Sequence, residues 1–132
     1  MEIVYQLNEP VKVDDVIRVF RNSGITRPVD QEERIQKMLD NANLIVTAWD
    51  NDRLVGIARA ITDFSYCCYL SDLAVDKDYQ KSGIGKKLID KVKETIGEEV
   101  ALILLSAPNA MDYYPKVGFD RIDNGYIIRR TR

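Results

Sequence analysis

The chain has 132 residues, of which 19 are basic and 21 acidic, so its formal net charge is −2, and it contains no histidine. Its composition, 45% hydrophobic and 30% charged, is that of an ordinary globular protein, and we expect a single cytoplasmic domain over residues 1–132, since MEIVYQLNEP lacks a signal-peptide layout. Because the chain has no block of like charges, we expect neither nucleic-acid nor membrane partners. Because it has no histidine, Ser-His-Asp triads, Cys-His pairs and most zinc sites are excluded, and no metal is expected.

The first part of the chain predicts one strand and two helices. The segment EIVYQL alternates apolar and polar residues, which predicts a first strand. Asp14 can cap a helix whose apolar stripe ends at Gly24. A second helix is expected over QEERIQKMLDNA, after Pro28 and Asp30, because acidic residues occupy its first turn.

Strand-like segments dominate the middle of the chain. The run LIVTAWDNDRLVGIARAI reads as two strands joined by a tight turn at Asp50-Asn51-Asp52, and SYCCYLSDLAV reads as another strand. Neighbouring residues of a strand point to opposite faces, so Cys67 and Cys68 are expected to be reduced packing residues rather than a disulfide. An amphipathic helix should follow from Ile84 to Ile96.

The last third predicts three more strands and a short helix. VALILLSAP is apolar throughout, which is typical of a buried strand. Asn109 can begin a short helix through Tyr113 and Tyr114, and FDRIDNGYIIRR suggests a closing hairpin around Asp123-Asn124-Gly125. The order of these elements indicates a mixed α/β layer structure.

A glycine turn between the strand Leu73-Ala74-Val75 and the helix at Ile84 is the main functional signal. Gly83 and Gly85 lie where main-chain N–H groups at a helix N-terminus are unpaired, so the turn can accept an anion at short range. The spacing fails the Walker A pattern, and Leu88 stands where a Rossmann fingerprint needs a third small residue. The pattern that remains is Gln-x-x-Gly-x-Gly over residues 80–85.

This pattern resembles the pyrophosphate motif of the GNAT superfamily, the acetyl-CoA-dependent N-acetyltransferases, [QR]-x-x-G-x-[GA] after an L-A-V strand. A second family element, an apolar strand, an Asn and then Ala-x-x-Phe-Tyr-x-x-x-Gly-Phe, is matched by LILLSAPNAMDYYPKVGF. Here Tyr113 replaces the usual Phe, and Tyr114 stands at the family Tyr. The resemblance covers essentially the whole chain. It implies a mixed, mostly antiparallel central sheet flanked by helices, whose central parallel strands splay apart.

The resemblance also implies acetyl-CoA as the cosubstrate and assigns residues to it. In the family the pantetheine arm lies between the two splayed strands and pairs with main-chain groups of the L-A-V strand, while the N–H groups of the glycine turn bind the diphosphate. The residues implied are Leu73, Ala74, Val75, Gln80, Lys81, Ser82, Gly83, Ile84, Gly85, Lys86 and Asn109. Asn109 has an alternative interpretation as the cap of the short helix.

Two residues are candidates for proton transfer. Tyr114 matches the family position near the coenzyme sulfur, where a phenol can donate a proton to the leaving thiolate; its alternative is a buried aromatic beside Phe119. Asp72 is unusual in an apolar strand and is a candidate base, directly or through water, although a bulge or local hydrogen bonds would explain it equally. An N–H near Val75 would polarise the thioester carbonyl.

The acceptor is less defined by the sequence. In the family the acceptor cleft is formed by the link between the first two helices, here RNSGITRPVD, and by the late hairpin. Arg21 or Arg27 is a candidate partner for a carboxylate, or a surface arginine. We expect a small-molecule amine acceptor, with a protein N-terminus or lysine as alternative, and the family makes a homodimer plausible. A CoA-binding sensor without transferase activity is the competing function.

Overall fold

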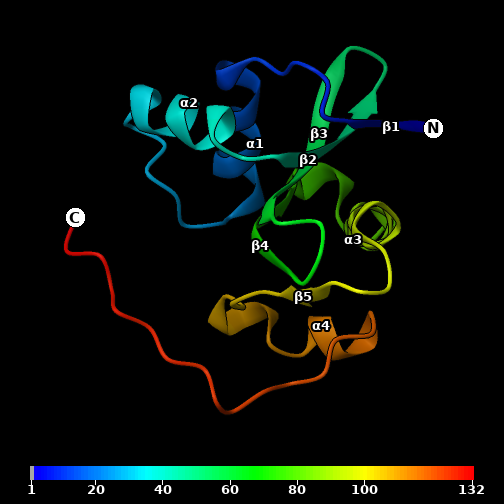
Figure 1. Ribbon diagram of the computed structural model, residues 1–132. Coiled ribbons are helices and arrows are strands. Elements are labelled where there is room, and N and C mark those ends of the chain that lie inside the picture. The colour runs from blue at the N-terminus through cyan, green and yellow to red at the C-terminus, as the bar shows by residue number, and fades with distance from the viewer. Residues whose placement is uncertain (1) are drawn as a thin grey trace.

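The protein is described by a computed structural model over residues 2–132, and its centre is a five-stranded sheet (Figure 1). The strands follow one another in chain order across the sheet, and all neighbours are antiparallel except the last pair, β4 and β5. The strands are β1 (Ile3–Leu7), β2 (Leu44–Asp50), β3 (Arg53–Thr62), β4 (Cys67–Val75) and β5 (Ala101–Ile103). This arrangement confirms the predicted fold class, including the parallel pair.

Helices cover both faces of the sheet. On one face lie α1 (Val13–Ser23) and α2 (Glu32–Asp40), and on the other lies α3 (Ile84–Ile96). The α1 stripe buries Val16, Val19 and Phe20 completely, as its 3.6-residue period predicts. The predicted bounds of α3 are confirmed, whereas α1 begins before Asp14, which therefore does not cap it.

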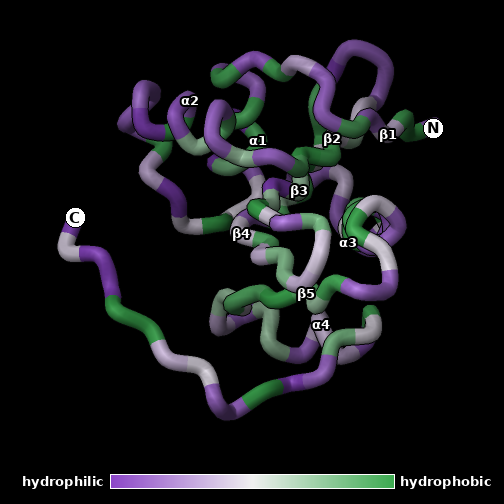
Figure 2. Tube along the Cα trace, in the orientation of Figure 1, coloured by the Kyte–Doolittle hydropathy of each residue, from purple (hydrophilic) through white to green (hydrophobic). Residues whose placement is uncertain are grey.

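The sheet is thus the middle of three layers with an apolar core on each side. The core under α3 contains Leu88, Ile89 and Val92 against residues of β2, β3 and β4. The core under α1 and α2 contains Phe20 and Ile35 against Leu54, Ile57 and Ala74 of the sheet. Figure 2 shows this pattern as hydrophobic segments gathered where the strands cross the helices.

A bulge in β4 changes which side chains face each core. Arg59 of β3 pairs with Asp72, but the next residue, Ala60, pairs with Leu70, so Ser71 is an extra residue in β4. Before the bulge Leu70 faces α3, whereas beyond it Leu73 faces α3 and Ala74 faces α1. A one-residue slip reverses the faces of a strand, and here it turns Asp72 toward the α1–α2 side.

The C-terminal third differs from its prediction. The expected buried strand over residues 100–108 is reduced to β5. Leu102 and Leu104 pack against the core under α3 and are half-buried, whereas Ala101 and Ile103 are exposed on the other face. A 3₁₀ helix, η2 (Pro108–Ala110), and a single turn, α4 (Tyr113–Lys116), follow. The predicted hairpin around residues 123–125 is wrong for this structure, since the chain after Phe119 runs extended, with no strand partner among the described residues.

Cys67 and Cys68 are both free thiols on opposite faces of β4, as predicted, but only Cys68 is buried. Cys67 is exposed, so its predicted packing role is wrong. Among residues 2–132, no helix has the length and apolar character needed to cross a membrane.

Candidate coenzyme and acyl-transfer site

The site begins with a gap in the sheet. β4 and β5 pair only from Cys67 opposite Ala101 to Tyr69 opposite Ile103, although β4 continues to Val75. Among the described residues, the edge of β4 that faces β5 therefore has no partner strand beyond Tyr69. Its main-chain N–H and C=O groups there can bind an extended ligand as an added strand would.

The glycine turn lies at the open end of this gap and begins α3. Lys81 and Gly83 adopt left-handed φ values of 67° and 85°, and a side chain built on Gly83 would meet no atom within 4 Å. The first bond of α3 joins Lys87 N–H to the carbonyl of Gly83 at 3.1 Å. The N–H groups of the preceding residues in this turn have no helical acceptor and carry the positive end of the helix dipole.

Polar side chains fix the shape of the turn. The Asp76 carboxylate is buried and accepts hydrogen bonds from the Asp78 N–H at 3.1 Å and from Asn22 and Arg53 at 3.2 Å each. Burial acts to raise the pKa of Asp76, but these hydrogen bonds outweigh it and hold the pKa below its usual value. Gln80, the first residue of the motif, donates to the Val75 carbonyl at 2.9 Å. The motif glutamine thus stabilises the turn by binding the end of β4.

A second group of contacts anchors the turn from outside. The short 3₁₀ helix η1 (Lys77–Tyr79) is tied to β2 by the Tyr79 hydroxyl, which donates to Asp50 at 2.7 Å. Lys86 is paired with Asp90 one helical turn later, at 3.0 Å. A hollow of about 610 Å³ lies beside Gly83 and is bordered by Lys86, Lys87 and Lys91. Glu2 and Asp90 also line the hollow, so its three lysines exceed its two carboxylates by one charge.

Tyr113 lies over the second glycine of the motif. A side-chain carbon built on Gly85 would come within 2.8 Å of the Tyr113 hydroxyl, so the absent Cβ leaves room for the phenol. Burial raises the pKa of Tyr113, which keeps its hydroxyl protonated near neutral pH. Gly85 thus has a packing role toward α4 in addition to any role toward a ligand.

Tyr114 lies next to Tyr113 and forms an aromatic cluster with it and Phe119. Its ring lies edge-on to Tyr113 at 5.3 Å and to Phe119 at 5.5 Å between centroids. Burial is the main cause that raises the pKa of Tyr114; the Tyr113 phenol adds to this and the Arg27 guanidinium opposes it. The Tyr114 hydroxyl therefore remains protonated at neutral pH.

Asp72 lies in the centre of an ion-pair network. The carboxylate is fully buried; Arg27 Nε donates to one oxygen at 2.5 Å, and Arg59 Nε donates to the other. Both arginines also reach Ser71, Arg27 through its carbonyl at 2.7 Å and Arg59 through its hydroxyl at 3.0 Å. Both carboxylate oxygens are thus engaged, and the role of Asp72 as the base stays a prediction.

Two further predicted residues, Asn109 and Arg21, make few contacts. Asn109 is exposed in η2, and its side chain caps neither that helix nor α4. Arg21 of α1 makes only a long contact, 3.5 Å, with the Val29 carbonyl. Sequence reasoning missed Asp76, Arg59 and the Tyr113–Gly85 contact, because no local pattern distinguishes them before the strands are paired.

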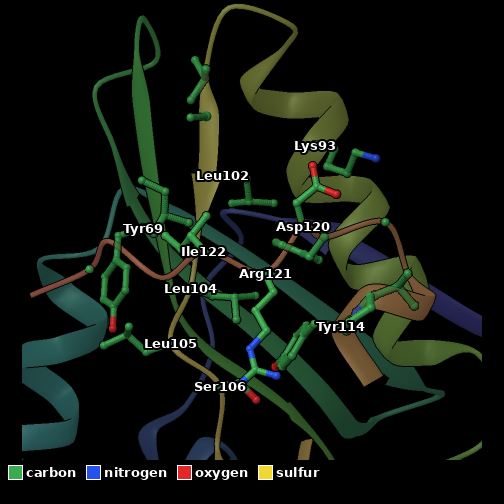
Figure 3. Close-up of a pocket in the computed structure, with 18 of the residues that line it drawn as sticks. Tyr69, Lys93, Leu102, Leu104, Leu105, Ser106, Tyr114, Asp120, Arg121 and Ile122 are labelled. Atoms are coloured by element: carbon green, nitrogen blue, oxygen red, sulfur yellow. The ribbon is translucent and has the colours of Figure 1, made fainter. Parts of the chain in front are cut away.

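A cavity of about 1440 Å³ opens next to Tyr114 (Figure 3). β5 and the residues after it form one wall, and the chain after Phe119 forms the opposite wall. In Figure 3 the side chains of Arg121, Ser106 and Tyr114 point toward one another across this space. The cavity lies outside the gap between β4 and β5, so it is a second space beside Tyr114.

These features fit coenzyme A. The gap offers unpaired main chain of β4 to a pantetheine arm, and the turn at Gly83 offers free N–H groups and open space to a diphosphate. Among residues 2–132, no cluster of metal-binding side chains is found, and the expectation that no metal is needed stays a prediction.

Comparison with known proteins agrees with this geometry. Residues 11–128 match the family model described as acetyltransferase (GNAT) domain. The chain is 28% identical over 131 residues to an uncharacterized N-acetyltransferase, ycf52, of Pyropia yezoensis, and the match covers 94% of this chain and 74% of that protein. The chain therefore belongs to the GNAT acetyltransferase family and is an acyltransferase.

Solved structures show the same fold. A probable acetyltransferase from Staphylococcus aureus superposes with a TM-score of 0.82 at 27% identity, covering 98% of this chain and all of that one. The aminoglycoside N-acetyltransferase AAC(6′)-Iy, solved with CoA, superposes with a TM-score of 0.75 at 14% identity. The match covers 99% of this chain and 96% of that one. At this identity the second likeness shows the fold alone.

Proposed function

We propose that the protein transfers the acetyl group of acetyl-CoA to a primary amine, in one complex of both substrates. The observation that carries the proposal is the end of β4–β5 pairing at Tyr69, with the glycine turn and Tyr114 on the borders of the resulting gap. Acetyl-CoA supplies an activated acetyl thioester. The residues predicted for it, Leu73–Val75, residues 80–86 and Asn109, all belong to β4, the glycine turn or η2.

The chain supplies positioning and one proton in this reaction. The amine nitrogen forms a bond to the acetyl carbon, the carbon–sulfur bond breaks, and Tyr114 gives its phenolic proton to the thiolate that leaves. Its raised pKa keeps that proton available at the pH of the reaction. An N–H near Val75 polarises the carbonyl oxygen of the thioester.

The amine must lose a proton before it attacks. We propose that water carries this proton to solvent, because both oxygens of Asp72 already accept hydrogen bonds from arginines. Asp72 then acts as a positioning residue: it holds Arg27, and with it the link between α1 and α2, next to Tyr114. This link is the predicted wall of the acceptor cleft.

We further propose a small-molecule amine as acceptor. The name of AAC(6′)-Iy gives an aminoglycoside, a small molecule, as its acceptor, and its fold is shared along nearly the whole chain. Arg27 is a quarter exposed beside Tyr114, so an acceptor with an acidic group would be favoured there. Acetylation of a protein N-terminus or lysine is the alternative substrate class, and a cytoplasmic location and a homodimer remain parts of the proposal.

The experiment compares two neighbouring tyrosines. Purified protein, acetyl-CoA and a panel of amines are mixed, and the release of free thiol is measured for the wild type, Tyr114→Phe and Tyr113→Phe. Loss of the proton donor should lower kcat about tenfold or more in Tyr114→Phe. The matched control Tyr113→Phe keeps the aromatic packing and should retain kcat within about twofold.

Two outcomes would contradict the proposal. Unchanged kcat in Tyr114→Phe would remove the assigned role of that residue. CoA binding by calorimetry without thiol release for any amine, including peptides with free N-termini, would instead favour a CoA-binding sensor.

A further inference from the structure

The stretch of β4 assigned to the coenzyme, Leu73–Val75, is paired along one edge. On that edge Ala74 lies opposite Ile57 of β3, and Val75 lies opposite Gly56. The other edge faces the gap, where the pantetheine arm is proposed to bind. Contacts that fix this stretch from outside the gap would raise the affinity for the coenzyme, because a preorganised site does not pay an ordering cost on binding.

The end of α1 and the link after it, residues 22–27, contact β4 on both sides of this stretch. Before it, Arg27 donates to the Asp72 carboxylate at 2.5 Å and to the carbonyl of the preceding residue at 2.7 Å. After it, Asn22 donates to the Asp76 carboxylate at 3.2 Å. In Figure 1 this segment leaves the end of α1 beside β4. One short segment therefore holds β4 before and after the residues assigned to the coenzyme.

The contact of Asn22 with Asp76 reaches the glycine turn directly. The Asp76 carboxylate is fully buried where β4 ends and the turn begins. One of its oxygens accepts the Asp78 N–H at 3.1 Å, and the other accepts from both Asn22 and Arg53 at 3.2 Å each. A buried carboxylate is held by such partners because an unpaired charge in the interior is costly. Asn22 thus orients the carboxylate, and the carboxylate orients the start of the turn.

A second contact joins the same end of α1 to the motif. The Gln80 amide donates to the Val75 carbonyl at 2.9 Å and to the Ser23 carbonyl at 3.4 Å. Val19 and Phe20, one turn earlier in α1, are fully buried, so this end of the helix is anchored in the core. The turn is therefore attached to a rigid part of the fold.

We propose that Asn22 is a positioning residue for the coenzyme. Through the Asp76 carboxylate it holds the glycine turn and the end of β4 in the conformation that binds acetyl-CoA. This inference rests on the proposed function. It adds that coenzyme affinity depends on a side chain of α1, a helix outside the motif and on the opposite face of the sheet from α3.

The test exchanges the two side chains. Asn22→Asp places a second carboxylate against Asp76, and the repulsion should displace the turn and raise the Kd of CoASH about tenfold or more, as measured by calorimetry. Asn22→Asp combined with Asp76→Asn restores one donor and one acceptor between the two positions. The new carboxylate then lies beside Arg53, because Asn22 and Arg53 reach the same oxygen. This double variant should return the Kd to within about threefold of the wild type.

Kinetics and a matched control separate positioning from a loss of stability. In Asn22→Asp the KM for acetyl-CoA should rise with the Kd, whereas kcat at saturating acetyl-CoA should stay near that of the wild type. The control is Asn43→Ala, because Asn43 binds both main-chain groups of Thr62, at 2.6 and 3.0 Å, at the other end of β3 from the turn. It should lower the free energy of unfolding in urea and leave the Kd of CoASH unchanged.

Two results would overturn the inference: an unchanged Kd in Asn22→Asp, or a raised Kd that the double variant does not recover. If Asn22→Asp does not fold, Asn22→Ala removes the donor without adding a charge, and an unchanged Kd in that variant would overturn the inference as well. A wild type that binds no CoASH would contradict the proposed function itself, so the two failures are distinguishable.

Discussion

At the residue scale, Asp63 shows how one carboxylate organises a turn. It lies between β3 and β4, and one oxygen accepts the N–H groups of Ser65, Tyr66 and Cys67 at 2.9, 2.8 and 3.1 Å. These bonds, with that of Tyr66 the strongest, lower the pKa of Asp63 to about 2. The same kind of residue, Asp72, is instead buried between two arginines, so the environment decides what each aspartate does.

We expect Asp63 to make the stability of the fold depend on pH in the acidic range. The folded pKa of about 2 is lower than the unfolded value of about 3.9, so the ionised form stabilises the folded state. This contribution is complete above about pH 5 and is lost as the pH falls toward 2. Carboxyl NMR titration should give the low pKa, and Asp63→Asn should lose the corresponding pH dependence of the unfolding free energy. A titration near pH 4 would contradict this.

Asp72→Asn should lower the free energy of unfolding by about 3–5 kcal/mol, because it leaves the buried Arg59 without its charge partner. Urea denaturation measures this change. The matched control is Asp15→Asn, which breaks the part-exposed pair with Arg18 and should cost less than about 1 kcal/mol. If Asp72→Asn kept full stability but lost thiol release, the carboxylate would act in the chemistry rather than in positioning.

At the element scale, α3 packs closely on the sheet at Gly56. A side-chain carbon on Gly56 of β3 would lie 3.2 Å from both Ile84 Cγ2 and Leu88 Cδ1, so the helix that begins with the glycine turn approaches the strand closely. The position of the turn therefore depends on a residue that is far from it in the sequence.

Gly56→Ala should destabilise the protein by about 1–3 kcal/mol, since an added methyl forces the buried Ile84 and Leu88 to move. Thermal or urea unfolding measures the effect. Gly125→Ala is the control, because a methyl group there meets no atom within 4 Å, and it should change stability by less than about 0.5 kcal/mol. Equal effects in the two variants would contradict this packing argument.

The sequence predicted elements best where the pattern itself is complete. α3 was predicted with the bounds it has, because its apolar stripe and Gly97 determine both the face and the end. The strand over residues 100–108 and the late hairpin were predicted wrongly. Whether an apolar segment forms a long buried strand depends on tertiary contacts that the local pattern does not specify. In the site, the glycine turn was predicted from its motif, whereas the partners of Asp72 became visible only once β3 and β4 were paired.

At the scale of the whole molecule, the gap separates two parts of the chain that are joined by a short strand pair and by a few apolar side chains. Residues up to Val75 and helix α3 share the main core, while β5 and α4 are joined to it by three β4–β5 residue pairs and by Tyr114 and Phe119. A ligand in the gap would connect the two parts. The proposed coenzyme site therefore predicts a strong coupling between binding and stability.

CoASH should raise the unfolding free energy by about 2.7 kcal/mol at a concentration of 100 Kd. At equal concentrations it should stabilise the fold more than adenosine 3′-phosphate 5′-diphosphate, which has the diphosphate but no pantetheine arm to bridge β4 and β5. Thermal unfolding with each ligand checks this. Equal stabilisation by both would show that the phosphates alone bind and that the gap stays empty.

The extra residue at Ser71 divides β4 into two halves with opposite inside–outside patterns. If β4 paired with β3 without this bulge, the Asp72 carboxylate would instead point into the apolar core beneath α3, and Arg27 and Arg59 would lose their counter-ion. Insertion of one residue into either half of β4 would reverse the faces of the residues beyond it, so we expect selection experiments on this strand to select against such insertions.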